Sequence, residues 1–128
     1  MGEYEYRIDP SKNRLYIRLS GFFKDDEVDP LLQELQRRLT GVPPGFDVVT
    51  DLTGFKPGNT AAAEALRRGG ELVKTKGRRR AVRVTGGLVS GLLQFKRILR
   101  PVFKDEDVRY ARSVTEADRI LDSWDEGD

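Results

Sequence analysis

The sequence contains no cysteine and no histidine. Without cysteine the chain cannot form a disulfide, and it has neither a thiol nucleophile nor a thiolate metal ligand. Without histidine, the usual nitrogen ligand of zinc and iron is missing, and so is the base of serine–histidine and cysteine–histidine pairs. These absences predict a protein with no metal site and no cofactor, and they fit a reducing compartment.

Long apolar runs are also missing. No stretch approaches the ~20 apolar residues that a helix needs to cross a bilayer, so we expect no membrane span. The first six residues include acids and no apolar run, which is unlike a secretory signal. The expected location is therefore the cytoplasm.

Acidic residues are scarce in one part of the chain. From residue 65 to residue 104 there are twelve basic residues and one acid, Glu71, although the net charge of the whole chain is only +2. This distribution predicts one positive side of the molecule. The densest part is a predicted basic patch formed by Arg67, Arg68, Lys74, Lys76, Arg78, Arg79 and Arg80.

The length of 128 residues predicts one domain, which we place at 1–124, followed by an acidic tail at 125–128. Alternating apolar residues at 4–8 and at 15–19 predict an antiparallel hairpin. Apolar residues at helical spacing predict a helix that starts at Asp25 or Asp26 as its cap and ends near residue 40. The stretch 46–55, with the more uniformly apolar Val48, Val49 and Leu52, predicts a central strand covered on both faces, and the loop at 53–60 is the candidate contact surface.

Further elements follow in alternation. We predict helices at 60–76, 88–99 and from 114 onward, and strands at 81–84 and 108–110. The pair Gly69-Gly70 inside the first of these helices predicts either close backbone packing or a bend, and Ser113 with Glu116 matches a capping box. The order β-β-α-β-α-β-α-β-α predicts a single two-layer α/β domain with a mostly parallel sheet and an N-terminal antiparallel hairpin strand at the edge.

The end of the predicted central strand is the candidate site, because open α/β sheets tend to bind ligands beyond the carboxyl ends of their strands. Its candidate binding residues are Asp51, Thr53, Gly54 and Asn59. Asp51 has an alternative, structural role, in which it accepts hydrogen bonds from loop N–H groups and holds the loop in shape. It has no visible catalytic partner in the sequence, which argues against acid–base chemistry.

The element order, the motif Asp51-Leu52-Thr53-Gly54 and the closing segment 111–117 resemble the STAS domain, more narrowly its SpoIIAA-like branch. The resemblance implies a non-enzymatic regulatory or interaction module. It also implies a phosphoacceptor at Thr60, although the family's neighbouring acid is Asn59 here and its glycine is absent. The alternative is that Thr60 or Asn59 simply caps the helix.

Two functions from different classes therefore stand as hypotheses. The first is a module that docks a protein partner or small ligand at the loop after the central strand, with a homodimer through the apolar helix at 88–99 as one form of partner. The second is a binder of anions, either nucleic acid or acidic phospholipid head-groups, through the basic face at 67–100. That face lacks interleaved aromatic residues for stacking on bases, so the sequence favours the first.

Overall fold

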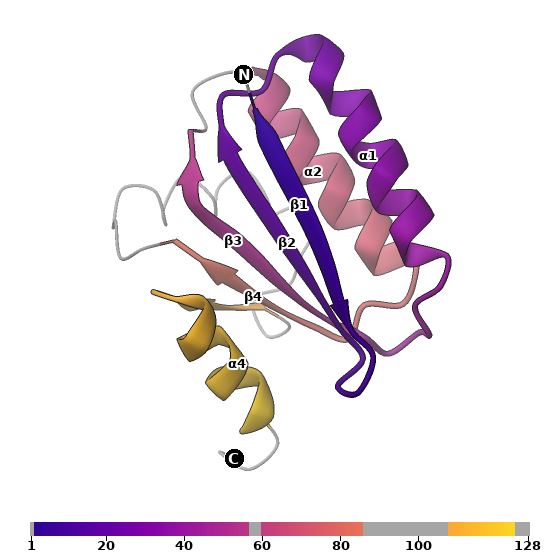
Figure 1. Cartoon of the computed structure of the whole chain (residues 1–128), viewed down its shortest axis with the longest axis vertical. Coiled ribbons are helices and arrows are strands. Elements are labelled where there is room, and N and C mark those ends of the chain that lie inside the picture. Colours follow the sequence, from indigo (N-terminus) through magenta and orange to yellow (C-terminus); the bar gives the residue numbers. More distant parts are fainter. Residues whose placement is uncertain (1, 57–59, 86–107, 125–128) are drawn as a thin grey trace.

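The computed structural model describes residues 2–56, 60–85 and 108–124 (Figure 1). The predicted helix at 88–99 and the acidic tail lie outside the described residues. Within them the elements are β1 (Glu3–Asp9), β2 (Arg14–Gly21), α1 (Asp25–Leu39), β3 (Asp47–Phe55), α2 (Thr60–Thr75), β4 (Arg80–Val84), β5 (Val108–Ala111) and α4 (Val114–Asp122). No helix in these ranges is both long enough and apolar enough to cross a membrane.

The five strands form one sheet in the order β1-β2-β3-β4-β5. β1 pairs antiparallel with β2, and the other three pairings are parallel. The structure therefore confirms a mostly parallel sheet, with β3 at its centre and the hairpin strand β1 at its edge. β5 forms the opposite end of the order.

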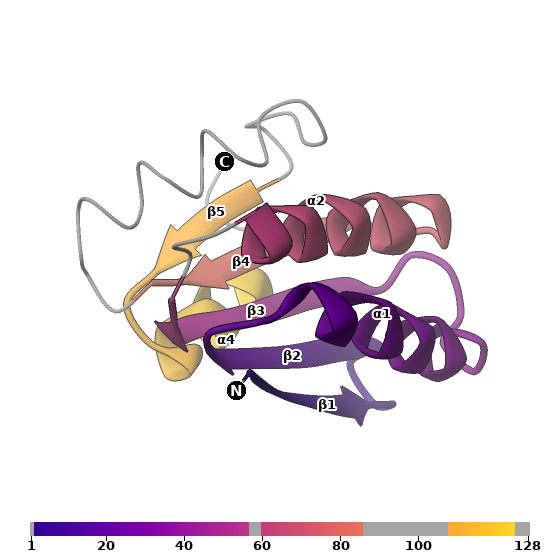
Figure 2. The ribbon, with the colours of Figure 1, turned by 90° about the horizontal axis from the view of Figure 1, so that it is seen from above.

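Helices cover both faces of the sheet (Figures 1 and 2). Successive side chains of a strand point to opposite faces, so Val48 of β3 joins the core under α1 and α2, and Val49 joins a second core under α4. The predicted two-layer arrangement is therefore wrong for the described chain, which has three layers. The reason is the double-sided burial of β3, which one helical layer cannot provide.

The two faces differ in how much of the sheet is covered. On the face that we call the two-helix face, α1 and α2 pack side by side, and Leu15, Phe23 and Phe46 are completely buried. On the opposite, one-helix face, α4 packs on β3, β4 and β5. β2 is tied to α4 there by Arg14, whose guanidinium nitrogens lie 2.9 Å from Asp118 and 3.0 Å from Asp122.

The first turns of the helices show how the sequence sets their ends. Ser113 is the N-cap of α4, and its hydroxyl accepts a hydrogen bond from the N–H of Glu116 at 3.1 Å, as predicted. The predicted caps of α1 are wrong, because Asp25 and Asp26 lie inside its first turn and Lys24 is the N-cap. Lysine has no acceptor to offer, and the N–H of Lys24 instead donates to the carboxylate of Glu27 at 2.9 Å.

Candidate functional site

The predicted strand-end residues lie inside β3 rather than in the loop after it. β2 and β3 stay paired as far as Gly54, opposite Ser20, and Phe55, opposite Gly21. The prediction that Thr53 and Gly54 belong to a loop is therefore wrong. Asn59 lies outside the described residues, and Thr60 is the first residue of α2.

A change of register separates the two halves of this pairing. Asp51 pairs with Arg18 and Gly54 with Ser20, so β3 uses one residue more than β2 between these positions. An extra residue of this kind is a β-bulge, which changes the face to which later side chains point. As a result Leu52 and Phe55, three residues apart, are both buried in the same core.

The carboxylate of Asp51 holds this bulge in place. Its Oδ1 accepts a hydrogen bond from the N–H of Thr53 at 3.1 Å and another from the Thr53 hydroxyl at 2.8 Å. Both bonds satisfy donors at the point where the regular ladder is interrupted. Asp51 therefore has a structural role, but it holds a bulge inside β3 rather than the predicted loop.

Gly54 is required by close packing of the two strands. A Cβ atom added to Gly54 would lie 3.1 Å from the Cβ of Ser20, closer than side chains normally approach. The glycine of the Asp51–Gly54 motif thus lets β3 return to β2 directly after the bulge.

A pocket of about 140 Å³ opens on the one-helix face beside Asp51. We call it the strand-end pocket, and its lining comes from β1, β2, β3 and the first residue of α4: Glu5, Arg7, Tyr16, Ile17, Arg18, Val49, Asp51 and Val114. Of the predicted site residues that the structure describes, Asp51 lines it. Thr53 and Gly54 follow further along β3 and are exposed.

The polar side chains of the strand-end pocket are held by neighbours. The Arg7 guanidinium stacks on the ring of Tyr16 at 3.9 Å, and Arg18 lies 3.9 Å from Glu5. The Tyr16 hydroxyl donates to Asp118 at 2.6 Å. Burial and this hydrogen bond raise the pKa of Tyr16, so the phenol remains a neutral donor.

The residues of the predicted basic patch lie in several different environments. Arg67 pairs with Glu64 and Glu71 on α2, the latter at 3.1 Å, and Arg68 pairs with Asp29 of α1 at 3.1 Å. Two exposed lysines lie near the end of α2: Lys74 and Lys76. The positive charges of Arg67 and Arg68 are therefore partly balanced by neighbouring carboxylates.

The three consecutive arginines at the start of β4 lie in different surroundings. Arg78 is buried under α2, whereas Arg79 makes a two-pronged ion pair with buried Asp47 at 3.2 and 3.1 Å. Arg80 lies over the ring of Trp124 at 5.1 Å, on the one-helix face. The sequence places these residues together, but the alternation of side chains along a strand separates them.

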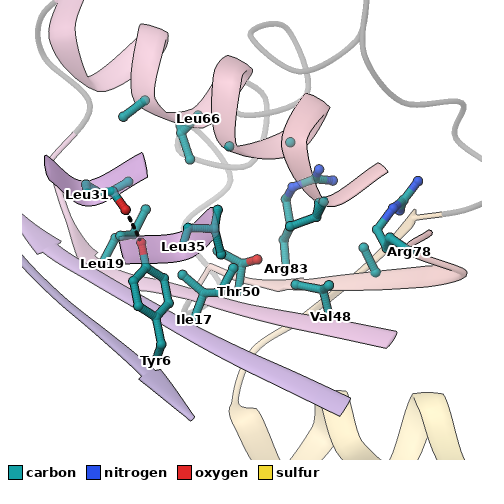
Figure 3. Close-up of a pocket in the computed structure, with 15 residues that line it drawn as sticks. Tyr6, Ile17, Leu19, Leu31, Leu35, Val48, Thr50, Leu66, Arg78 and Arg83 are labelled. Carbon is teal, nitrogen blue, oxygen red and sulfur yellow. Dashed lines mark hydrogen bonds between the residues drawn. The ribbon is translucent and has the colours of Figure 1, made fainter. Parts of the chain in front are cut away.

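The sequence did not reveal an interior cavity on the two-helix face. It measures about 50 Å³ and lies between the sheet and the two helices, with apolar walls and three polar side chains (Figure 3). The polar residues are Thr50, Arg78 and Arg83. A sequence signal was available for Thr50, which lies two residues from Val48 and from Leu52 in an apolar strand.

In the ranges that the structure describes, no three acidic side chains gather closely enough to hold a metal ion. Comparison of the chain with models of known families finds no match, and comparison with curated proteins finds none either.

Proposed function

We propose that this domain is a non-enzymatic regulatory or interaction module of the STAS type, and that it docks a protein partner at the strand-end pocket. The observation that carries the proposal is the position of that pocket: it opens beside Asp51 of the central strand, next to the start of α4. The residues that line the pocket stand in the middle of β1, β2 and β3, on the one-helix face beside the start of α4, and a hollow with a few converging polar groups is a usual place for binding.

The charges of the strand-end pocket favour a polypeptide as the occupant. Two basic side chains, Arg7 and Arg18, and two acidic ones, Glu5 and Asp51, line it. Such a balanced set matches a partner segment that itself carries both signs of charge, because complementary potentials determine register and specificity. A uniformly anionic partner would meet as much repulsion as attraction there.

The anion-binding alternative receives less support from the described part of the basic face. Arg67, Arg68 and Arg79 each pair with a carboxylate, and Arg78 is buried. Exposed, uncommitted charge is what phosphate binding draws on. A salt-titrated gel shift and a liposome flotation assay would test this alternative directly, and retention at low salt in either would revive it.

The proposal can be tested by crosslinking in the cells that produce the protein. A photoreactive residue replaces Arg18, which is exposed beside the strand-end pocket, and a matched control replaces the exposed Gln36 of α1. We expect discrete adducts from position 18 that are absent from position 36, and we expect Asp51→Lys to reduce them. Identical adducts from both positions would contradict the proposal, as would a measurable turnover that is lost in Asp51→Ala.

A further inference from the structure

The outer backbone edge of β1 is a surface that the function proposed above does not use. In the described part of the chain β1 stands at the end of the strand order, and no described element lies beyond it (Figure 2). Every second residue of such an edge strand directs its N–H and C=O groups outward, where another strand can pair with them. The edge is therefore able to extend the sheet.

β1 has few of the features that prevent pairing at an edge. Natural edge strands are often short, or they contain proline, lysine or a bulge. β1 extends over seven residues, Glu3–Asp9, with neither proline nor lysine, and its pairing with β2 has no register shift. β5, at the opposite end of the strand order, has four residues. β1 is thus the longer of the two edges, and it is regular along its whole length.

The side chains of β1 divide between the two faces of the sheet. Tyr6 is buried in the core of the two-helix face, and Ile8 packs against the same core. Glu5 and Arg7, at the alternate positions, line the strand-end pocket on the one-helix face. A strand that continues both faces must therefore place apolar residues beside Tyr6 and Ile8, and charged residues beside the other two.

A second copy of β1 in the antiparallel direction meets this requirement. Two-fold symmetry, the commonest in homodimers, makes the two copies of one strand antiparallel. With Tyr6 opposite Tyr6 of the second copy, Glu5 stands opposite Arg7 and Arg7 opposite Glu5, so two pairs of opposite charge form. Tyr4 then stands opposite Ile8 on the two-helix face. Tyr4 is 39% exposed in the single chain, and an aromatic ring beside a β-branched side chain is a favourable pair across strands.

The neighbouring antiparallel registers are less favourable. Strands centred on Glu5 would bring that carboxylate opposite its own copy, and strands centred on Arg7 would bring the two guanidinium groups together. In the register centred on Tyr6, the pair of like charge is Glu3 with Asp9. This pair stands at the ends of the strands, where solvent and salt screen it. The charge pattern of β1 therefore favours the register centred on Tyr6.

We propose that two copies of this chain form a symmetric dimer by antiparallel pairing of their β1 strands, centred on Tyr6. The two-fold axis is then perpendicular to the sheet, so both strand-end pockets open on the same side of the joined sheet. The pairing occupies the same edge in both copies, and assembly therefore stops at two chains. Because one pair of strands buries less than the ~1,600 Å² of a standard interface, we expect a dissociation constant of about 10–100 μM.

Charge reversal on β1 tests the proposal, with association of the full chain measured by sedimentation at several concentrations. Glu5→Arg gives β1 two positive residues at positions 5 and 7, and Arg7→Glu gives it two negative ones. We expect each variant alone to associate about tenfold more weakly than the parent chain, because like charges then stand opposite each other. An equimolar mixture of the two variants should associate at least as tightly as the parent, since opposite charges meet again at both positions.

Two controls separate pairing from folding. Arg112→Glu changes the net charge as Arg7→Glu does, but at an exposed residue after β5, and it should associate as the parent does. The chain with both exchanges, Glu5→Arg and Arg7→Glu, keeps the composition and should also dimerise like the parent. Thermal unfolding at low concentration shows that each variant is folded. Recovery of association in the mixture cannot come from unfolded chains.

Three results would overturn the proposal. The first is a parent chain that stays monomeric up to about 1 mM, tenfold above the weakest dissociation constant that we expect. The second is undiminished association of Glu5→Arg and Arg7→Glu, which would place the contact between copies elsewhere. The third is a mixture that associates no better than each variant alone. All three are measured without a partner protein, so they do not bear on docking at the strand-end pocket, which the crosslinking experiment tests.

Discussion

The two faces of the sheet differ in how completely helices cover them. The two-helix face is covered by α1 and α2, and the largest buried side chains, Phe23 and Phe46, lie on it. The one-helix face is covered by α4 over β3 to β5, and its pocket lies toward β1 and β2. A sheet face covered by helices buries apolar side chains, which stabilises the fold. A face that is covered incompletely leaves polar side chains accessible to a partner.

A well-buried region of the molecule can also contain a candidate site. The two-helix face contains two arginines that are nearly inaccessible to water, Arg78 and Arg83, and the more open one-helix face contains one, Arg14. The open face carries more exposed charge, but its arginines rest on rings or acids, such as Tyr16 and Glu5. Each face therefore offers one candidate site of a different kind.

Matched leucines test the unequal cores most strongly. Leu39 lies in the last turn of α1 and Leu121 in the last turn of α4, and both are buried. We expect Leu39→Ala to cost about 3–4 kcal/mol of unfolding free energy and Leu121→Ala about 2–3 kcal/mol, because a thinner layer collapses more easily around the lost atoms. Urea unfolding followed by circular dichroism measures both, and a larger loss for Leu121→Ala would reverse the comparison.

Matched glycines test the junction between the faces, where the bulge of β3 returns to β2. Gly54→Ala would place its Cβ 3.1 Å from Ser20, and we expect a loss of about 1–2 kcal/mol from overpacking. Gly41→Ala meets nothing within 4 Å and should be neutral or stabilising by about 0.5 kcal/mol. Thermal unfolding of both variants measures the two effects. Equal midpoints would show that β2 and β3 can move apart at Gly54 without a loss of stability.

Matched caps compare the helices of the two faces. Ser113→Ala removes the side-chain acceptor from the start of α4 and should cost about 1 kcal/mol. Lys24→Ala removes no acceptor from the start of α1, because the bond there uses the main chain of residue 24, so we expect a change below about 0.5 kcal/mol. The two unfolding free energies are measured in urea, and a smaller effect at Ser113 than at Lys24 would contradict the capping assignment.

The smallest expected effect is a pH dependence of the tie between β2 and α4. The hydrogen bond from Arg14, aided by Lys12, holds the pKa of Asp122 below its usual value. A lowered folded-state pKa adds stability above the ordinary pKa of about 3.9, and this contribution is lost as the pH falls through the folded-state pKa. Because the carboxylate is half exposed, the contribution should stay below about 1 kcal/mol.

The check is to measure the unfolding free energy of the parent chain and of Asp122→Asn at pH 7 and at pH 3. The parent should be more stable at pH 7, and the difference should shrink at pH 3. Arg14→Met should reduce the dependence on residue 122, leaving the smaller part that comes from Lys12. An unchanged difference at pH 3 would show that the Asp122 carboxylate contributes nothing through its charge.

Periodicity predicted most of the fold. Strands β1 to β5 follow from alternating or continuous apolar runs, and the central place of β3 follows from its two buried neighbours, Val48 and Val49. The third layer was missed although the apolar stripe of α4 was recognised, because a stripe shows that a helix packs without showing on which side. The handedness and the number of the crossover connections determine on which face of the sheet a helix packs. The pattern of apolar residues shows neither of them.

The candidate sites were predicted less completely. Asp51 was identified from its place at a strand end, and its bonds to Thr53 give it a structural role inside β3 rather than in the predicted loop. The bulge after Asp51 was not foreseen, because one extra residue leaves no mark in apolar periodicity over so short a run. The interior cavity escaped as well, since it depends on Thr50 and Arg83 becoming neighbours through strand pairing between distant parts of the chain.

The hairpin strand at the margin of the sheet has a consequence for how molecules of this protein meet. β1 alternates charged residues with apolar ones, as in Glu3, Glu5 and Arg7, and its outer backbone edge has no strand beside it in the described chain. A copy of the same strand added in parallel register would bring like charges together, and natural sheets use charged edge residues to prevent edge-to-edge association. At high concentration we therefore expect the protein to resist fibril formation through β1, although the outer edge of β1 has no paired strand in the described chain.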